Sequence, residues 1–168
     1  THDVGLSGLS EKELIQIVDF LSLKMQVFIS CEHKLPNNLL KYKLTVPPDL
    51  IHNVLAYSSL VISEGATLAA EASFLGVPTI YINPQETCNI EELKENGCVY
   101  SYRNGVGVLQ KTKEIINDKN LKKQIMEKAS QMVIEKTNLT SFLVWFVENF
   151  PISLRVMKDN PSFQESFK

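Results

Sequence analysis

The apolar residues of this chain follow two kinds of spacing, one typical of helices and one typical of buried strands. The stretch LSEKELIQIVDFL opens with a capping box, in which Ser10 is followed three residues later by Glu13, and continues with apolar residues at helical spacing. We therefore expect a helix that begins after Ser10. Short apolar runs predict strands at residues 25–30, 60–63, 78–83 and 98–102, with a shorter one at 42–45.

Helical patterns fill most of the intervals between these strands. Asp49 can cap a helix that runs to Ser58, and the segment GATLAAEASFLG predicts a helix ended by Gly76. Further helices are predicted at residues 90–97, 106–117, 120–134 and 139–150. The residues after the last helix, 152–168, carry no regular pattern, so we expect an irregular tail there.

Strands that alternate with helices through short links indicate a parallel sheet, because parallel neighbours need a crossover connection. The runs LVIS and TIYI are apolar on both sides, as expected of strands that helices cover on both faces. We expect an α/β fold: a doubly wound, mostly parallel, Rossmann-like sheet. Residues 1–150 would form one domain and residues 151–168 a C-terminal tail.

Composition narrows the function classes. With 44% hydrophobic residues, 21% charged residues and a net charge of −2, the chain is unlike a nucleic-acid binder or a membrane-surface binder. No apolar run approaches the roughly 20 residues of a membrane span. The three cysteines are scattered, without metal-ligand spacing. This usage predicts reduced thiols in a cytoplasmic protein and argues against a metal site. We also expect no cofactor.

The turn after the strand at 60–63 is the first candidate binding site. Ligands of open parallel sheets bind beyond the carboxyl ends of the strands. The residues at this end are Ser63, Glu64, Gly65 and Ala66, and a helix follows directly. The first N–H groups of a helix and its dipole attract phosphate. Gly65 would let a phosphate approach the backbone, and Thr67 would add a hydroxyl group.

Glu71 is the unusual residue of the helix that follows, a lone carboxylate in an alanine-rich run. It shares a face with Thr67, four residues earlier, and lies about 9 Å along the axis from Gly65. That spacing suits a diphosphate at Gly65 and an attached ribose at Glu71, whose carboxylate would accept hydrogen bonds from the ribose hydroxyls. The alternative is a helix that merely begins at a glycine and carries a solvent-facing glutamate.

The segment SEGATLAAEASFLGVP resembles the nucleotide-binding segment in the C-terminal half of GT-B proteins. These include the UDP-N-acetylglucosamine 2-epimerases and the MurG-type glycosyltransferases. Their pattern of a glycine with a small neighbour, a glutamate and Gly-x-Pro is matched by Gly65, Ala66, Glu71, Gly76 and Pro78. The resemblance implies that Gly65, Ala66 and Thr67 contact the diphosphate and that Glu71 contacts the ribose. Ala66 replaces the second glycine of the epimerases, which bears on the identity of the sugar.

A longer resemblance covers most of the chain. HDVGLSGLS, VFISCE, the segment from PPDL to GVP, and LTSFLVWFVENFP resemble the C-terminal half of an uncharacterised family similar to the 2-epimerases. The members of that family are longer than this chain, which starts at Thr1 without an initiator methionine. We therefore expect a fragment of a two-domain protein whose N-terminal domain is missing.

Four further residues are site candidates. His2 is the candidate catalytic acid or base, since histidine titrates near neutral pH, and a disordered terminus is the alternative. Glu32 would hold a substrate hydroxyl, or it is a solvated loop carboxylate. His52 would reach a uracil or a phosphate, or it lies on a helix surface. Asn83, together with Thr87, would close over the ligand.

Two functions from different classes follow. The first is the nucleotide-sugar-binding half, with UDP-sugar as ligand, of a GT-B-like epimerase or glycosyltransferase that works in the cleft between its two halves. The isolated half would then be inactive. The second is a non-catalytic domain that binds a nucleotide or a partner protein, because one fold hosts many functions.

The predicted helix at 139–150 is apolar around most of its circumference. A surface helix needs only one apolar stripe, so a second surface must cover the rest. The resemblance implies a crossing to the missing N-terminal half, which would leave an aromatic patch at Trp145 and Phe146 exposed and open to self-association as a homo-oligomer. The alternative is a helix packed between the sheet and the tail at 152–168.

Overall fold

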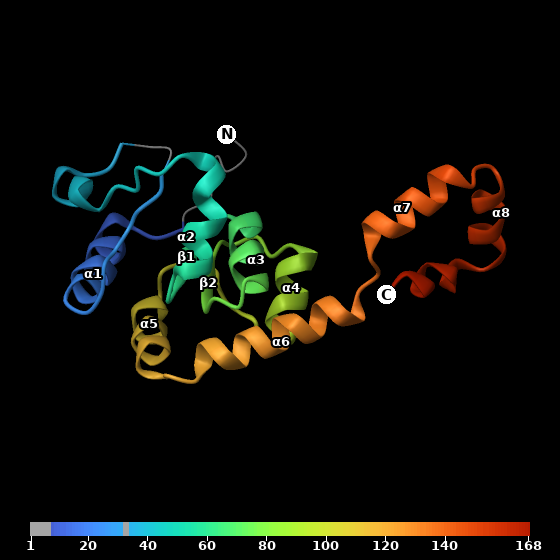
Figure 1. The fold of residues 1–168 in the computed structure, drawn as a ribbon. Coiled ribbons are helices and arrows are strands. Elements are labelled where there is room, and N and C mark those ends of the chain that lie inside the picture. Colours follow the sequence, from blue (N-terminus) through green and yellow to red (C-terminus); the bar gives the residue numbers. More distant parts are fainter. Residues whose placement is uncertain (1–7, 32–33) are drawn as a thin grey trace. The chain divides into compact units, whose positions relative to one another are not determined.

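The computed structural model describes residues 8–31 and 34–168 (Figure 1). The chain divides into two compact units, residues 1–129 and residues 130–168, and each is described by itself. None of the helices in the described ranges combines the length and the hydropathy that crossing a bilayer would require.

Three parallel strands form the sheet of the first unit. They are β1 (Val61–Ser63), β2 (Thr79–Ile82) and β3 (Val99–Tyr102), and they lie side by side in the order β1-β2-β3. Every residue of β2 is buried, as expected of a central strand with helices on both sides. The predicted α/β fold with a parallel sheet is confirmed.

Helices connect these strands in the way that parallel pairing requires. Helix α2 (Ile51–Tyr57) precedes β1, α3 (Ala66–Phe74) joins β1 to β2, and α4 (Cys88–Glu95) joins β2 to β3. Gly76 and Gly97 follow α3 and α4 with φ values of 75° and 67°, so both helices end at the glycines that the sequence predicted.

Two apolar layers lie on opposite faces of the sheet. Helices α1 (Glu11–Ser22) and α5 (Val108–Asn117) pack on Ile80 and Ile82. Val61 packs with Ala72 of α3 and with α2 on the other face, because successive residues of a strand point to opposite sides. Helix α1 begins with the predicted capping box, whose Ser10 and Glu13 satisfy each other's backbone N–H groups.

Helix α6 (Leu121–Glu135) begins in the first unit, and its part up to residue 129 passes the amino ends of the strands. Lys122 Nζ donates to the carbonyl oxygen of Ser58, just before β1, at 2.8 Å. Further along α6, Met126 approaches Gly76, just before β2, so closely that a Cβ on that glycine would lie 2.8 Å from the Met126 Cβ. The amino edge of the sheet is therefore covered by a helix.

The predicted strands at 25–30 and 42–45 are wrong. A single parallel bridge between Ile29 and Lys43 is the pairing observed for these segments, and residues Asn37–Tyr42 form a 3-10 helix. Met25 and Val27 pack against the α1 side of the core, whereas Phe28 is exposed. The segment is thus extended and buried on one side, and among the described residues the pairing goes no further than this bridge.

Asp49 does not cap α2. It lies inside a 3-10 turn, Pro48–Leu50, and α2 begins at Ile51 without a side-chain cap. The cause is the pair Pro47-Pro48, because a proline at the first position of a turn fixes its φ and starts the helical chain earlier.

The second unit contains α7 (Leu139–Glu148), α8 (Ile152–Asp159) and a 3-10 helix, Pro161–Phe167. The expectation of an irregular tail is therefore wrong. The Trp145 ring lies 4.7 Å from that of Phe163 and 5.4 Å from that of Phe167, and buried Ser153 donates to the carbonyl oxygen of Phe146 at 2.6 Å. These aromatic contacts order the tail.

The expected exposed aromatic patch is not observed. Trp145 and Phe146 are half-buried, and rings of the tail contact Trp145. The alternative expectation, a helix packed against the tail, therefore holds for the contact with the tail. The exposed large hydrophobic side chains of α7 are aliphatic instead, namely Leu139, Leu143, Val144 and Val147.

Candidate functional site

The turn between β1 and α3 is fixed by a serine side chain. Ser63 is buried, and its Oγ accepts the N–H of Gly65 at 3.1 Å and donates to the Gly65 carbonyl oxygen at 3.0 Å. A predicted ligand-binding hydroxyl is thus engaged in shaping the turn. The turn directs the chain into α3, with Gly65 as its N-cap residue.

The start of α3 presents backbone N–H groups at the carboxyl edge of the sheet. The first hydrogen bond of the helix joins the Ala69 N–H to the Gly65 carbonyl oxygen at 3.1 Å, so the N–H groups of Ala66, Thr67 and Leu68 lie ahead of the helical ladder. Gly65 and Thr67 are exposed and Ala66 is half-buried. Accessible donors and the positive end of the helix dipole make this a surface on which an anion can bind.

The fold does not require a glycine at position 65. Its φ of −95° suits any residue, and a Cβ there would meet Ser63 Oγ alone, at 3.8 Å. Position 76, by contrast, requires glycine for two reasons: its φ is positive, and Met126 leaves no space for a Cβ. The open space above Gly65 is compatible with close approach of a ligand.

Thr67 and Glu71 lie on the open side of α3, opposite the buried Ala69 and Ala72, as their spacing predicted. Glu71 is not isolated, because Nε2 of His52 on α2 lies 3.4 Å from its Oε2. The side chains of His52 and Glu71 are 63% and 38% exposed. Two predicted site residues from neighbouring helices are therefore brought together on an accessible surface.

Glu64 ties three segments together at the carboxyl edge. Its Oε1 accepts the N–H of Leu9 at 2.7 Å, and its carbonyl oxygen accepts from Asn83 Nδ2 at 3.1 Å. A Cβ on Gly8 would lie 2.1 Å from the same Oε1, so a side chain at position 8 would push the flexible Glu64 side chain out of this position. This carboxylate is occupied by the protein's own backbone.

Asn83 has a similar structural role at the end of β2. Its Nδ2 reaches the turn after β1, and its Oδ1 accepts the N–H of Gln85 at 2.9 Å. The amide therefore joins the turns that follow two adjacent strands. The predicted partner Thr87 lies at the start of α4 and donates to Asn89 Oδ1.

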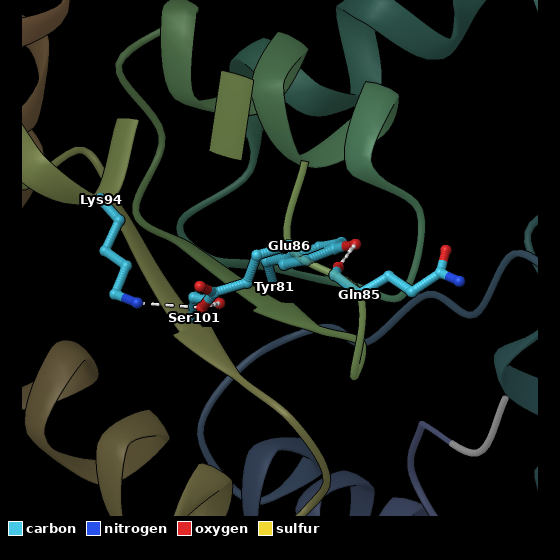
Figure 2. A network of polar contacts seen from close by, with 5 residues as sticks. All are labelled: Tyr81, Gln85, Glu86, Lys94 and Ser101. Atoms are coloured by element: carbon cyan, nitrogen blue, oxygen red, sulfur yellow. Dashed lines mark hydrogen bonds and ion pairs between the residues drawn. The ribbon is translucent and has the colours of Figure 1, made fainter. Parts of the chain in front are cut away.

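A polar network not predicted from the sequence anchors the loop after β2 (Figure 2). Glu86 Oε1 accepts from Lys94 Nζ on α4 and from Ser101 Oγ on β3, each at 2.9 Å, and the Tyr81 hydroxyl donates to the Gln85 carbonyl oxygen at 2.8 Å. The hydrogen bonds from Lys94 and then Ser101 hold the pKa of the Glu86 carboxyl below its ordinary value. The sequence carries no local signal for these pairs.

Two of the predicted site residues, His2 and Glu32, lie outside the described residues. Their roles as catalytic acid or base and as substrate ligand stay predictions. Within the described ranges, no group of three or more histidine, cysteine, aspartate or glutamate side chains is placed to hold a metal ion.

Two hollows of the first unit lie away from the α3 start. One of about 350 Å³ is lined by Glu13, Gln16 and the glycine turn before α5, and one of about 480 Å³ is lined by residues 25–28 and 41–43 with Ser22. Neither is lined by the predicted site residues in the described part of the chain. The α3 start is an open surface of the sheet edge.

Comparison with protein-family models, with curated proteins and with solved structures finds no match to this chain.

Proposed function

We propose that this chain is the nucleotide-sugar-binding half of a GT-B-like epimerase or glycosyltransferase, with a UDP-sugar as its ligand. The observation that carries the proposal is the start of α3, where accessible N–H groups, the open Gly65 and the half-exposed Glu71 share the carboxyl edge of a parallel sheet. This is where open α/β sheets bind ligands. The resemblance of residues 63–78 to the GT-B nucleotide segment supports the choice of ligand.

The diphosphate would lie against the first turn of α3. The N–H groups of Ala66, Thr67 and Leu68 would donate to its oxygens, and the Thr67 hydroxyl would add a further donor. Hydrogen bonds to a charged group contribute about 1.5–3 kcal/mol each. In the bond-breaking step, the same donors would stabilise the charge that grows on the leaving diphosphate.

The ribose would lie one to two turns further along α3. Glu71 is six residues beyond Gly65, which corresponds to about 9 Å of helix. Its carboxylate would accept hydrogen bonds from the ribose hydroxyls. The group that moves a proton at the sugar carbon would be His2 or a residue of the N-terminal half, so the chain alone would bind without turnover.

A non-catalytic nucleotide-binding domain on the same fold is the second candidate. One observation favours it: Glu64, directly after β1, and Glu86, in the loop after β2, are both hydrogen-bonded within the protein. Carboxylates or histidines on the facing half would favour the enzyme, and a facing half without titratable groups would favour the binding module.

The test is calorimetric titration of the chain with UDP, GDP, CMP and their sugars, comparing wild type with Gly65→Val and Gly65→Ser. Valine would block the phosphate, and serine would add a Cβ while remaining a good N-cap residue. We expect UDP to bind wild type, and both variants to bind at least tenfold more weakly, about the loss of one charge-assisted hydrogen bond.

The Gly65→Ser variant separates binding from folding, because the space around residue 65 is open and its φ is ordinary. Its thermal midpoint should match that of wild type. Normal UDP affinity in Gly65→Val would place the phosphate elsewhere, and no nucleotide binding by wild type would remove the proposed function.

A further inference from the structure

The pair formed by His52 and Glu71 has no clear structural need. Both side chains are accessible, and the 3.4 Å between Nε2 and Oε2 is longer than an ordinary N–H···O hydrogen bond. Exposed pairs of this kind contribute little to the free energy of unfolding. The convergence of two polar side chains from α2 and α3, beside the accessible start of α3, instead suits recognition of a ligand.

The chemistry of the pair selects one class of ligand. An ionised carboxylate has two oxygens with about four acceptor sites, and a histidine contact at Oε2 leaves Oε1 and part of Oε2 available. Such an acceptor suits a group with two adjacent O–H donors, which is a vicinal diol. A metal ion is disfavoured, since no third acidic or histidine side chain joins the pair among the described residues.

We propose that His52 is a positioning residue that holds Oε2 of Glu71, so that the carboxylate is oriented to accept both hydroxyls of a ribose. This inference rests on the proposed function and deepens it, because it assigns the site a preference for ribonucleotides over 2′-deoxyribonucleotides. A deoxyribose offers one donor fewer, which leaves one acceptor of the oriented carboxylate without its partner.

The experiment compares the affinities of UDP and 2′-deoxy-UDP for wild type, His52→Ala, His52→Gln and Asn53→Ala. Wild type should prefer UDP. His52→Ala should weaken UDP binding by a factor of about two to five, the range for an exposed pair of polar side chains, and leave 2′-deoxy-UDP binding less affected. The preference for UDP should therefore fall. His52→Gln, which keeps an N–H donor, should restore it.

Asn53→Ala is the matched control, since Asn53 is the exposed neighbour of His52 on α2. It should leave both affinities unchanged. An unchanged preference for UDP in His52→Ala, or an equal loss for the two nucleotides, would overturn the role of His52 while the proposed function stands. Absence of UDP binding by wild type would instead reject the proposed function, so the two failures are distinguishable.

Discussion

Replacing Gly76 by alanine should destabilise the first unit more than the same change at Gly97. The two glycines are closely matched: each follows a crossover helix, each precedes a strand of the sheet, and their φ values are 75° and 67°. They differ in what a new Cβ would meet. At Gly76 it would lie 2.8 Å from Met126 Cβ and 3.0 Å from Met126 Cα, whereas at Gly97 it would lie 2.7 Å from Lys128 Nζ.

The magnitude follows from these neighbours. An alanine held at positive φ costs about 1–2 kcal/mol, and this applies to both positions. The Lys128 ammonium is the end of a flexible side chain and can move aside, so Gly97→Ala should cost little more than that. The Met126 atoms belong to the α6 backbone and its first side-chain carbon, so overpacking should add about 1–3 kcal/mol at Gly76.

Urea denaturation followed by far-ultraviolet circular dichroism measures the difference, provided that the slope of the free energy against urea is the same in all variants. Gly65→Ala is the control for a glycine with ordinary φ and open space, and it should be the mildest of the three. An equal loss of unfolding free energy in Gly76→Ala and Gly97→Ala would show that α6 does not approach Gly76 so closely. Adding Met126→Ala to Gly76→Ala should not restore stability, because alanine at position 126 keeps the Cβ that the new side chain would meet.

Two further predictions concern the polar network and the tail. Glu86→Gln should lower the free energy of unfolding by up to about 1 kcal/mol at neutral pH. A carboxyl whose folded pKa is depressed stabilises the fold above its unfolded pKa of about 4.3 and loses that contribution as the pH falls through the folded value. The gap between wild type and Glu86→Gln should therefore close in acid, and a gap that persists there would contradict the role of the charge. Trp145, the only tryptophan of the chain, should show blue-shifted, quencher-protected emission. Phe163→Ala should shift that emission to the red because it removes the nearest ring, whereas Ser162→Ala should not, and an unchanged spectrum in Phe163→Ala would mean that the tail does not cover Trp145.

Local signals account for the elements that the sequence predicted correctly. The capping box fixes the start of α1, Gly76 and Gly97 end α3 and α4, and the apolar run TIYI becomes a fully buried strand. The segment at 25–30 has similar local composition, but strand pairing depends on a distant partner, and only Ile29 finds one. The tail was missed because its order comes from ring contacts with Trp145, which no local pattern encodes.

In the candidate site too, local spacing was predictable and contacts between distant residues were not. The shared face of Thr67 and Glu71 follows from helical periodicity, so it was predictable. The occupation of Glu64 by Leu9, and the cross-link from Asn83 to Glu64, join residues that lie 55 and 19 positions apart in sequence. Residue type alone marked these side chains as polar groups near a strand end, and only the fold shows that their hydrogen bonds are already made.

The close approach of Gly8 to Glu64 has an evolutionary consequence. A side chain at position 8 would force the flexible Glu64 carboxylate to move away from the Leu9 N–H, and a loss of that carboxylate would leave the same N–H without this acceptor. A substitution at either position alone would therefore lose the hydrogen bond between Leu9 and Glu64. In sequences descended from a common ancestor of this chain, residues 8 and 64 should therefore covary, and a lineage that abandons the glutamate becomes free to abandon the glycine.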